Sequence, residues 1–432
     1  MTNLGFAIRA LRSRNYRLFF SGQSISLIGT WMTRVATSWL VYRLTGSSVL
    51  LGISSFAGQI PAFFLAPLAG VWVDRWDRHR TLVFTQTLSM VQSFALAILA
   101  LAHVITVPEI IVLAFAQGLI NAFDMPARQS FVVQMVEHRE DLSNAIALNS
   151  SMVNVARLIG PALGGMIIAA VGEGYCFLFD GISYLAVILS LLLMHVAPHV
   201  PRKIERRVLA ELKEGWRYVV ESIAIRSILL QLGVISLAGM PYAVLMPIMA
   251  SKVLHGGAHT LGFLMAATGV GALGGAASLA MRRSVLGLGR RIVYCSAAFG
   301  VSLIVFSQAR WLWLALVVLP IAGFSMMQQM AASNTILQTI VEDEKRGRVM
   351  SFYAMAFQGM APFGSLIAGA LAARIGTPET LAASGAVCIA GALWFSRQLP
   401  GIRQLLRPIY QRLGILPEVA LGLQHASAES QS

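Results

Sequence analysis

Long apolar segments alternate with short polar segments along nearly the whole chain. Twelve apolar segments reach about 20 residues, the length that a helix needs to cross the hydrocarbon core of a bilayer. They cover residues 17–41, 49–73, 81–103, 108–127, 143–170, 174–196, 226–250, 260–281, 291–308, 311–333, 347–371 and 378–397. This pattern predicts an all-α membrane protein with twelve transmembrane helices.

The longest polar segment between spans, residues 197–225, divides the twelve spans into two sets of six. Its second part alternates apolar and charged residues at helical spacing, as in an amphipathic helix on the inner leaflet, where anionic lipids would be partners. We therefore expect a six-helix bundle in 1–196, a linker in 197–225, a second bundle in 226–397 and a basic tail in 398–432 with a disordered end. Weak repeats support two pseudo-symmetric bundles, since Gly52 corresponds to Gly262 and Gly160-Pro161 to Ala361-Pro362.

Composition and charge agree with a bilayer environment. Of the 432 residues, 56% are hydrophobic and 12% are charged, whereas soluble domains carry about 25% charged residues. The net charge is +14, and most Lys and Arg residues fall in segments that would share one side of the membrane. This asymmetry follows the positive-inside rule and predicts cytoplasmic N- and C-termini. It also accounts for the basic balance without a nucleic-acid partner.

The chain carries no recognisable enzymatic or metal-binding motif. Its three cysteines are widely separated, so they predict neither a disulfide framework nor a metal site. HExxH, GxSxG and phosphate-binding glycine loops are absent, which argues against a membrane enzyme and against ATP as energy source. We expect no cofactor, and the first apolar segment is too long and too polar to be a cleaved signal peptide.

Polar residues inside the predicted spans are candidates for function, because they are costly in lipid. Three spans carry them on one side of a helix. The candidates are Gln23, Thr30 and Arg34 in span one, Gln117, Asn121, Asp124 and Arg128 in span four, and Gln328 and Gln329 in span ten.

Arg34, Arg157 and Asp180 are charged residues deep within spans. We predict that Asp180 pairs with one arginine, which leaves the other as a positive site for an anionic or catecholate-like substrate. A purely structural ion-pair network is the alternative. Asp124 and Asp180 are the acids that we place within spans, so both are candidates for carrying protons.

The loop after span two has the sequence Gly70-Val71-Trp72-Val73-Asp74-Arg75-Trp76-Asp77-Arg78-His79-Arg80. Its pattern resembles the signature loop of the major facilitator superfamily, and the resemblance extends over about residues 15–397. In that superfamily spans one, four, seven and ten surround the substrate cavity. The resemblance implies a gating loop made of Gly70, Asp74, Arg75, Arg78 and Arg80. Asp124 would pair with Arg75 or Arg78 to close it, a role that competes with proton transfer.

Span five carries Gly160-Pro161-Ala162-Leu163-Gly164-Gly165, which resembles the antiporter signature of exporters in this superfamily. The proline removes a backbone hydrogen bond, and the glycines allow a neighbouring helix to approach. The resemblance implies an antiporter helix that contains Arg157, Gly160, Pro161, Gly164 and Gly165, with Pro362 at the equivalent place in the other half. An ordinary glycine-rich packing face is the alternative.

Several shorter segments, including Asn15-Tyr16-Arg17-Leu18-Phe19 and Asp124-Met125-Pro126-Ala127-Arg128-Gln129, look like the enterobactin-exporter and macrolide-efflux branch, the transmembrane secretion effectors. This resemblance implies a monomeric exporter of a siderophore-like or drug-like small molecule in the bacterial inner membrane, driven by proton antiport. A solute importer and a non-transporting sensor or scaffold on the same fold remain as alternatives. Substrate identity and proton stoichiometry stay open.

Overall fold

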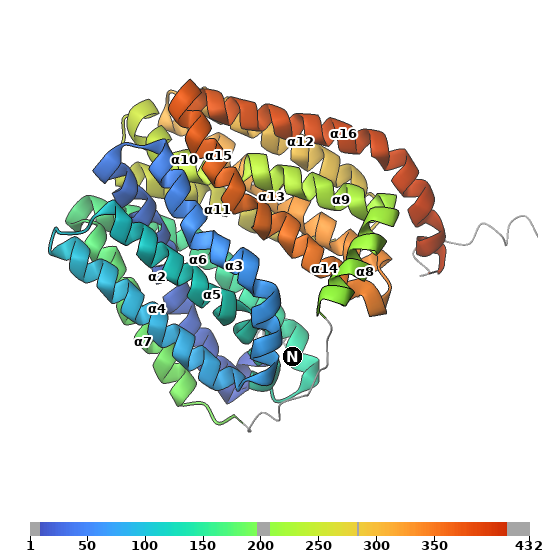
Figure 1. Ribbon diagram of the computed structural model, residues 1–432, viewed down its shortest axis with the longest axis horizontal. Coiled ribbons are helices and arrows are strands. Elements are labelled where there is room, and N and C mark those ends of the chain that lie inside the picture. The colour runs from blue at the N-terminus through green and yellow to red at the C-terminus, as the bar shows by residue number, and fades with distance from the viewer. Residues whose placement is uncertain (1–8, 197–207, 283–284, 413–432) are drawn as a thin grey trace, which may run out of the picture.

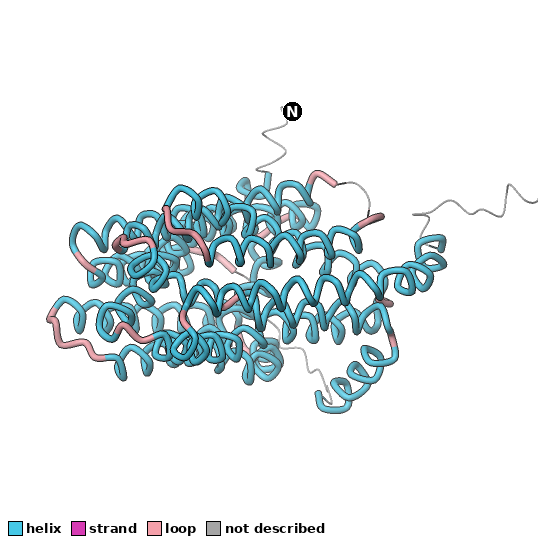
Figure 2. The backbone as a smooth tube through the Cα atoms, turned by 90° about the horizontal axis from the view of Figure 1, so that it is seen from above, coloured by secondary structure: helices cyan, strands magenta, loops and turns pink. Residues whose placement is uncertain are grey.

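The computed structural model describes residues 9–196, 208–282 and 285–412, and within these ranges the chain forms helices and short loops without a strand (Figure 2). Helices suit a chain in lipid because every backbone polar group is bonded within its own segment. The first helices are η1 (Arg9–Arg12), α2 (Arg14–Thr45), α3 (Ser48–Arg75), α4 (Arg78–Leu101), α5 (Val107–Met135), η2 (Arg139–Asp141), α6 (Leu142–Val171) and α7 (Glu173–Leu192). We call α2–α7 the N-terminal helices.

The remaining helices begin with α8 (Val208–Glu221), which lies where the sequence predicted a helix in the linker. We call α9–α16 the C-terminal helices. They comprise α9 (Ile223–Val234), η3 (Ile235–Gly239), α10 (Tyr242–Ile248), η4 (Met249–Val253), α11 (Ala258–Ala280), α12 (Leu288–Ser307), α13 (Leu312–Ile340), α14 (Asp343–Ala354), η5 (Met355–Gly359), α15 (Met360–Ile375) and α16 (Thr377–Arg412).

Eleven helices of the described chain are long and apolar enough to cross a membrane. The first predicted span, in α2, is not among them, because residues such as Gln23, Thr30 and Arg34 lower its apolar content. The count of twelve spans in two six-helix bundles therefore stays a prediction.

Two details of the C-terminal helices differ from the expected pattern. The seventh and eleventh spans each contain π-helical turns, η3 and η4 in one and η5 in the other. The last helix continues without a break from Thr377 to Arg412, so residues 398–412 extend it. The end of the tail, where disorder is expected, and the start of the linker, residues 197–207, lie outside the described residues.

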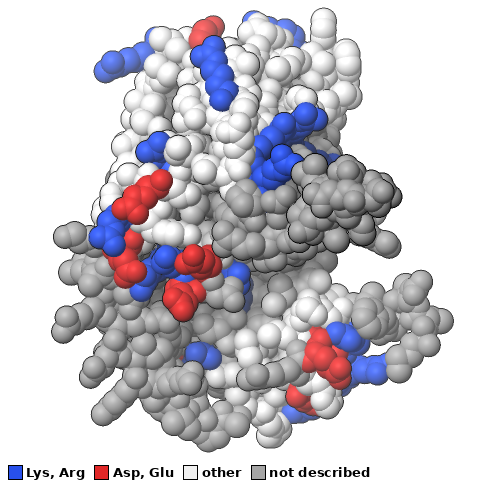
Figure 3. Space-filling model, turned by 90° about the vertical axis from the view of Figure 1, so that its right-hand side faces the viewer, with Lys and Arg blue, Asp and Glu red and all other residues white. Residues whose placement is uncertain are grey.

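Short connections reverse the chain at both ends of the helices. Gly46, Gly172 and Gly376 have positive φ angles of 61°, 97° and 98°, a conformation that glycine adopts without strain. They follow α2, α6 and α15, and we call this end the far end. The opposite end holds the start of α2 and the end of α16, and we call it the basic end after arginines such as Arg12, Arg14, Arg403 and Arg407. Figure 3 shows this end, where Lys and Arg side chains lie among Asp and Glu side chains.

The N-terminal helices pack mainly against one another, through α2 with α6 and α7, α3 with α5, and α4 with α7. The C-terminal helices do the same, through α11 with α13 and α12 with α13 and α16. The two groups meet chiefly along α6 with α11 and α3 with α15 (Figure 1).

Each of these two crossings has a pair of glycines at its contact. A methyl group on Gly165 of α6 would lie 2.9 Å from the Cα of Gly262 on α11. A methyl group on Gly369 of α15 would lie 3.2 Å from the Cα of Gly52 on α3. The backbones therefore touch without intervening side chains, as small residues allow in membrane helices. Both crossings lie toward the far end.

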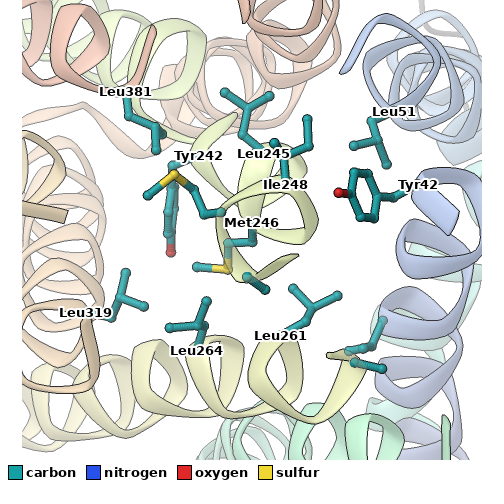
Figure 4. Packing of buried hydrophobic residues seen from close by; sticks show 14 of the residues in the cluster. Tyr42, Leu51, Tyr242, Leu245, Met246, Ile248, Leu261, Leu264, Leu319 and Leu381 are labelled. Carbon is teal, nitrogen blue, oxygen red and sulfur yellow. The ribbon is translucent and has the colours of Figure 1, made fainter. Parts of the chain in front are cut away.

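The apolar core is shared at the far end and divided at the basic end. One cluster joins residues of both groups, including Tyr42 and Leu51 with Tyr242, Met246 and Leu261 (Figure 4). At the basic end, one cluster contains residues of η1 and the N-terminal helices only, and the other contains residues of α8 and the C-terminal helices only. The two groups of helices are thus sealed together at the far end and separate at the basic end.

Candidate functional site

Arg34 of α2 and Arg157 of α6 both lie over the ring of Trp31. Their guanidinium carbons are 4.6 Å and 5.2 Å from its centroid, within the range of cation–π contacts. Gly160 leaves room for this arrangement, because a methyl group on it would lie 2.5 Å from the Cβ of Trp31. The first glycine of the span-five motif therefore lets the tryptophan approach both cations.

Neither arginine has an acidic partner among the described residues. Arg34 has protein on all sides, but its side chain is exposed to a space between the helices that water can enter. Arg157 is half-buried, and its Nε has no hydrogen-bond partner. The prediction that Asp180 neutralises one of them is wrong, since each guanidinium turns to Trp31 and Asp180 forms no ion pair. Two positive charges without an acidic partner therefore lie side by side over Trp31.

Asp180 lies on α7 among the hydroxyl groups of α2 and α4. Its side chain is 2% exposed. Ser93 donates a hydrogen bond of 3.0 Å to Oδ2, and the hydroxyls of Thr30 and Thr33 lie next to the carboxyl group. Oδ1 has no hydrogen-bond partner. It faces Gly29, where a methyl group would lie 2.9 Å away. A buried carboxyl group with a free oxygen and no cation is costly unless it takes up a proton or is hydrated.

Asp124 on α5 is buried but fully partnered. Arg128, one turn later, forms an ion pair with it. On the same carboxylate, Oδ1 accepts hydrogen bonds of 2.9 Å from Thr85 and 2.7 Å from Gln86 of α4. Arg78 instead donates to the carbonyl of Ser130 at 3.5 Å. Asp124 is thus held by Arg128 of its own helix in this structure. Its pairing with Arg75 or Arg78 in an outward-facing state stays a prediction.

Aromatic rings hold the signature loop to α5. Trp72 and Trp76 stack on Phe123 with centroids 5.9 Å and 6.1 Å apart. Asp77 accepts a hydrogen bond of 2.9 Å from the backbone N–H of Arg80 and so caps α4. The surroundings of Gly70 and the side chains of Asp74 and Arg75 lie outside the described part of the structure. The gating role of the loop stays a prediction.

The residues predicted to line the cavity differ in burial. Gln117 is half-buried and donates to the hydroxyl of Ser89 at 3.1 Å and to Asn121 at 3.2 Å. Gln328 is fully buried and donates to the carbonyl of Gly275 at 2.7 Å. Thr30 and Asn121 are half-buried, while Gln23 and Gln329 are buried. Of the seven predicted residues, Arg34 is exposed.

The glycines of span five contact two different helices. Gly160 and Gly164 pack on α2, where a methyl group on Gly164 would lie 3.1 Å from the Cα of Met32. Gly165 packs on α11 of the other group. Pro161 lies inside α6 without ending it, and Pro362 is buried in α15. The motif thus joins the arginine-bearing α6 both to its own group and to the C-terminal helices.

Some residues of the site were not found from the sequence. Trp31 was missed because an aromatic residue within an apolar span gives no signal. Tyr242 of α10, which lies within electrostatic range of Arg157 and next to Thr268 of α11, was missed for the same reason. Both groups of helices therefore contribute to the surroundings of the arginine pair.

Comparison with curated proteins finds transporters along nearly the full chain. The chain is 26% identical over 385 residues to the staphyloferrin A transporter of Staphylococcus aureus, covering 88% of this chain and 95% of that protein. It is 28% identical over 386 residues to the multidrug efflux pump Tap of Mycolicibacterium fortuitum, covering 87% and 93%. It thus resembles a siderophore transporter and a drug pump to a similar degree.

Solved structures show the same fold at low sequence identity. A bacterial homolog of the human lysosomal transporter Spinster, inward-facing and unoccupied, matches with a TM-score of 0.68 and 14% identity over 89% of this chain and 96% of that chain. A POT family transporter in complex with 5-aminolevulinic acid matches with a TM-score of 0.73 and 11% identity over 90% and 97%. Residues 6–414 match the family of transmembrane secretion effectors. The chain therefore belongs to this family of major facilitator transporters.

Proposed function

We propose that the protein is a secondary active exporter that moves a small anionic molecule out of the cytoplasm in exchange for protons. The chain is a transporter of the major facilitator type, and its relatives include siderophore and drug exporters. Direction, coupling and cargo are the proposed parts. The observation that best supports an anionic cargo is the pair of arginines, Arg34 and Arg157, which lie over Trp31 without acidic partners.

The arginine pair favours a substrate with more than one negative charge. Guanidinium groups bind carboxylates and similar anions through two parallel hydrogen bonds, and two of them can hold two such groups. Trp31 adds a flat apolar surface next to the cations. A siderophore-like molecule with carboxylate or catecholate groups meets these requirements, and a cationic drug does not.

Asp180 is the proposed proton carrier. Its carboxyl group is buried among hydroxyls, and Oδ1 is without a partner. Such a group is neutral when it carries a proton and uncompensated when it does not, so the two states differ strongly in energy. Asp124 has an ion pair in this structure, and we assign it the control of the basic end through Arg128.

The divided core supports transport by alternating access. The apolar cluster at the far end closes one side, and the two separate clusters leave the basic end open between the groups. We assign the basic end to the cytoplasm of a bacterial cell, with both termini there, by the positive-inside rule. The structure then corresponds to an inward-facing state, and rocking of the two groups would reverse the openings.

The linker and the tail fit the same orientation. Glu214 of α8 pairs with Arg348 of α14 at 2.7 Å, and Trp216 of α8 remains exposed. We propose that α8 lies on the inner leaflet, and that the basic residues that precede it in the sequence, Arg202, Lys203, Arg206 and Arg207, contact anionic lipids. The protein works as a monomer of two six-span bundles, since the site needs residues of one chain alone.

The proposal is tested by transport into inverted vesicles that hold the purified protein. Vesicles receive an inside-acidic pH gradient and one of three probes, staphyloferrin A, a catecholate siderophore or the fluorescent cation ethidium. We expect uptake of an anionic probe that an uncoupler abolishes and that Arg34→Ala reduces. Arg310→Ala, which removes an exposed arginine between α12 and α13, is the matched control and leaves uptake unchanged.

Other outcomes correct different parts of the proposal. Uptake of ethidium alone keeps the exporter and contradicts the anion site. Uptake that survives the uncoupler contradicts proton antiport. If the wild-type protein transports none of the probes, the sensor or scaffold alternative is favoured.

A further inference from the structure

Three hydroxyl groups line the buried face of α4. Thr85, Ser89 and Ser93 follow each other at intervals of four residues and are 3%, 2% and 1% exposed. At about 1.5 Å per residue, the row is about 12 Å long. Thr85 donates to Asp124 at 2.9 Å, and Ser93 donates to Asp180 at 3.0 Å. A row of buried hydroxyls therefore begins at one buried acid, Asp124, and ends at another, Asp180.

A further hydroxyl group near both acids belongs to α7. Tyr184 lies one turn after Asp180 on α7 and is 6% exposed. It is within electrostatic range of both Asp180 and Asp124, and it lies next to the hydroxyl of Thr30. A phenol between two carboxyl groups can accept a proton on its oxygen and donate the one it holds. Tyr184 thus offers a second route between the two acids, beside the hydroxyl row of α4.

Several side-chain oxygen atoms near these hydroxyl groups have no hydrogen-bond donor. Oδ1 of Asp180 and the Oε1 atoms of Gln86 and Gln117 are buried and have no hydrogen-bond partner. Buried polar atoms of this kind are usually satisfied by ordered water, which binds where several polar groups converge. Water at these positions would bridge the intervals between successive hydroxyls of α4.

The hydrogen bonds themselves are not fixed by local geometry. The single proton of Thr85 faces two acceptors, the carbonyl of Leu82 at 3.1 Å and the carboxylate of Asp124 at 2.9 Å. The hydroxyl of Thr87, on another face of α4, has the carbonyl of Val83 at 2.7 Å as its acceptor and lies outside the row. A hydroxyl group with a structural role needs one acceptor. A hydroxyl group in a proton relay must be able to turn between two acceptors.

The charged surroundings permit a proton to move between the two acids. Near Asp180 the ionisable groups are Tyr184 and Cys176 on α7. Arg34 on α2, which turns to Trp31, lies within electrostatic range of Tyr184. Near Asp124 they are Arg128 and Tyr184. From Thr81 to Leu101, α4 carries no ionisable residue. Arg157 on α6 turns to Trp31 as well.

We propose that these hydroxyls form a proton relay between Asp124 and Asp180 through the interior of the N-terminal helices. The inference rests on the proposed proton antiport. A proton that leaves one carboxyl group is accepted by the next hydroxyl oxygen or water, which releases its own proton onward. The last one is accepted by the other carboxylate, so that no electrons move. Protonation of Asp124 removes the negative charge that holds Arg128.

The relay is tested by following the two carboxyl groups directly. The full-length protein in lipid nanodiscs is subjected to a rapid drop in pH, and infrared spectroscopy records the protonated C=O bands. Asp124→Asn and Asp180→Asn assign the two bands. In the inward-facing state we expect Asp124 to be protonated from the basic end and Asp180 through the relay.

The decisive variant, Ser89→Ala with Tyr184→Phe, interrupts the hydroxyl row of α4 and removes the phenol of α7. We expect protonation of Asp180 to slow about tenfold, which corresponds to a barrier higher by about 1.4 kcal/mol, while that of Asp124 keeps its rate. Ser89→Thr in the Tyr184→Phe background restores the rate because it retains a hydroxyl. Thr87→Val, which removes a hydroxyl outside the row, is the matched control.

Each outcome decides the matter. An unchanged Asp180 rate in the double variant overturns the relay, and so does an equal slowing in Thr87→Val, which would indicate general loosening. If the double variant does not fold, Ser89→Ala alone gives the same comparison with a smaller slowing. Loss of antiport is measured separately by the uncoupler experiment in vesicles. A working relay without coupled efflux would contradict the proposed function and not the relay.

Discussion

The N-terminal and C-terminal helices have opposite kinds of interior. Asp124, Asp180 and Arg157 are buried or half-buried in the N-terminal helices. The energy of each of these side chains depends strongly on its charge and on its partner. The second group buries Gln231, Gln328 and other neutral side chains at comparable depth.

The two groups also differ in the continuity of their helices. In the N-terminal helices, the span-five helix α6 runs unbroken through Pro161. In the C-terminal helices, π-helical turns interrupt the corresponding span between α14 and α15, and two more interrupt the span that begins with α9. π-helical turns often mark functional sites. We propose that the first group carries the charges of the transport cycle and that the second supplies the bending.

The largest expected effect comes from removing the proposed proton carrier. Asp180→Asn keeps the shape of the side chain but cannot bind and release a proton. A gradient of one pH unit is worth about 1.4 kcal/mol and supports about tenfold accumulation for each proton exchanged. We expect this accumulation to disappear in the variant, while exchange of substrate without a gradient continues.

The control for this variant is another acid on α7. Glu173 is buried, but Arg43 neutralises it with hydrogen bonds of 2.7 Å and 3.1 Å. Glu173→Gln should keep pH-driven accumulation. If Asp180→Asn accumulates substrate as the wild type does, the charged interior of the N-terminal helices has a structural role.

A smaller effect is expected from the arginine pair. Hydrogen bonds to charged groups contribute about 1.5–3 kcal/mol, so Arg157→Ala should weaken binding of an anionic substrate by at least about tenfold. Arg157→Lys keeps the charge but loses the two parallel donors, and should fall between. Isothermal titration of the purified protein with staphyloferrin A measures both. Equal affinity in all three proteins would remove the arginine from the site.

The sequence predicted the helices well because the bilayer requires long apolar segments, whatever their partners. It also identified Arg34, Arg157, Asp124 and Asp180, since a charge within an apolar span stands out. It did not predict their partners, because pairing depends on how each helix is rotated against its neighbours. Asp180 faces hydroxyls and not an arginine for this reason.

The hydroxyls of α4 were missed for a different reason. Ser and Thr can bond to the carbonyls of their own helix and scarcely lower its apolar character. Their importance becomes visible only when the helix is placed against Asp124 and Asp180. Trp31 and Tyr242 were missed because nothing in the sequence distinguishes an aromatic residue beside a cation from one in contact with lipid.

The contact between the two groups gives a third prediction. Gly165→Ala would place a methyl group 2.7 Å from the carbonyl oxygen of Ala258 and 2.9 Å from the Cα of Gly262, both of them backbone atoms. The helices must move apart, which costs about 1–3 kcal/mol. We expect a lower thermal unfolding temperature and greater labelling of a cysteine placed at the far end.

Gly233→Ala is the matched control for this prediction. Gly233 lies inside α9 with no atom within 4 Å of an added methyl group. The change to alanine should stabilise the helix by about 0.5–1 kcal/mol. If both variants had the same effect, close approach of the two groups would not explain the glycine at 165.

The smallest effect concerns the bending of the C-terminal helices. The hydroxyl of Ser236, in η3, donates to the backbone carbonyl of Phe357, in η5, and so joins the two π-helical turns. Ser236→Ala removes a hydrogen bond worth about 0.5–1.5 kcal/mol. If the turns bend together, the variant should change the rate of substrate exchange about threefold or more and lower the unfolding temperature little. Ser302→Ala, whose hydroxyl bonds to a carbonyl of its own helix at 2.7 Å, is the control. Equal exchange rates in the two variants would mean that the π-helical turns do not move as a unit, and the contrast between a charged group and a bending group would then rest on the charges alone.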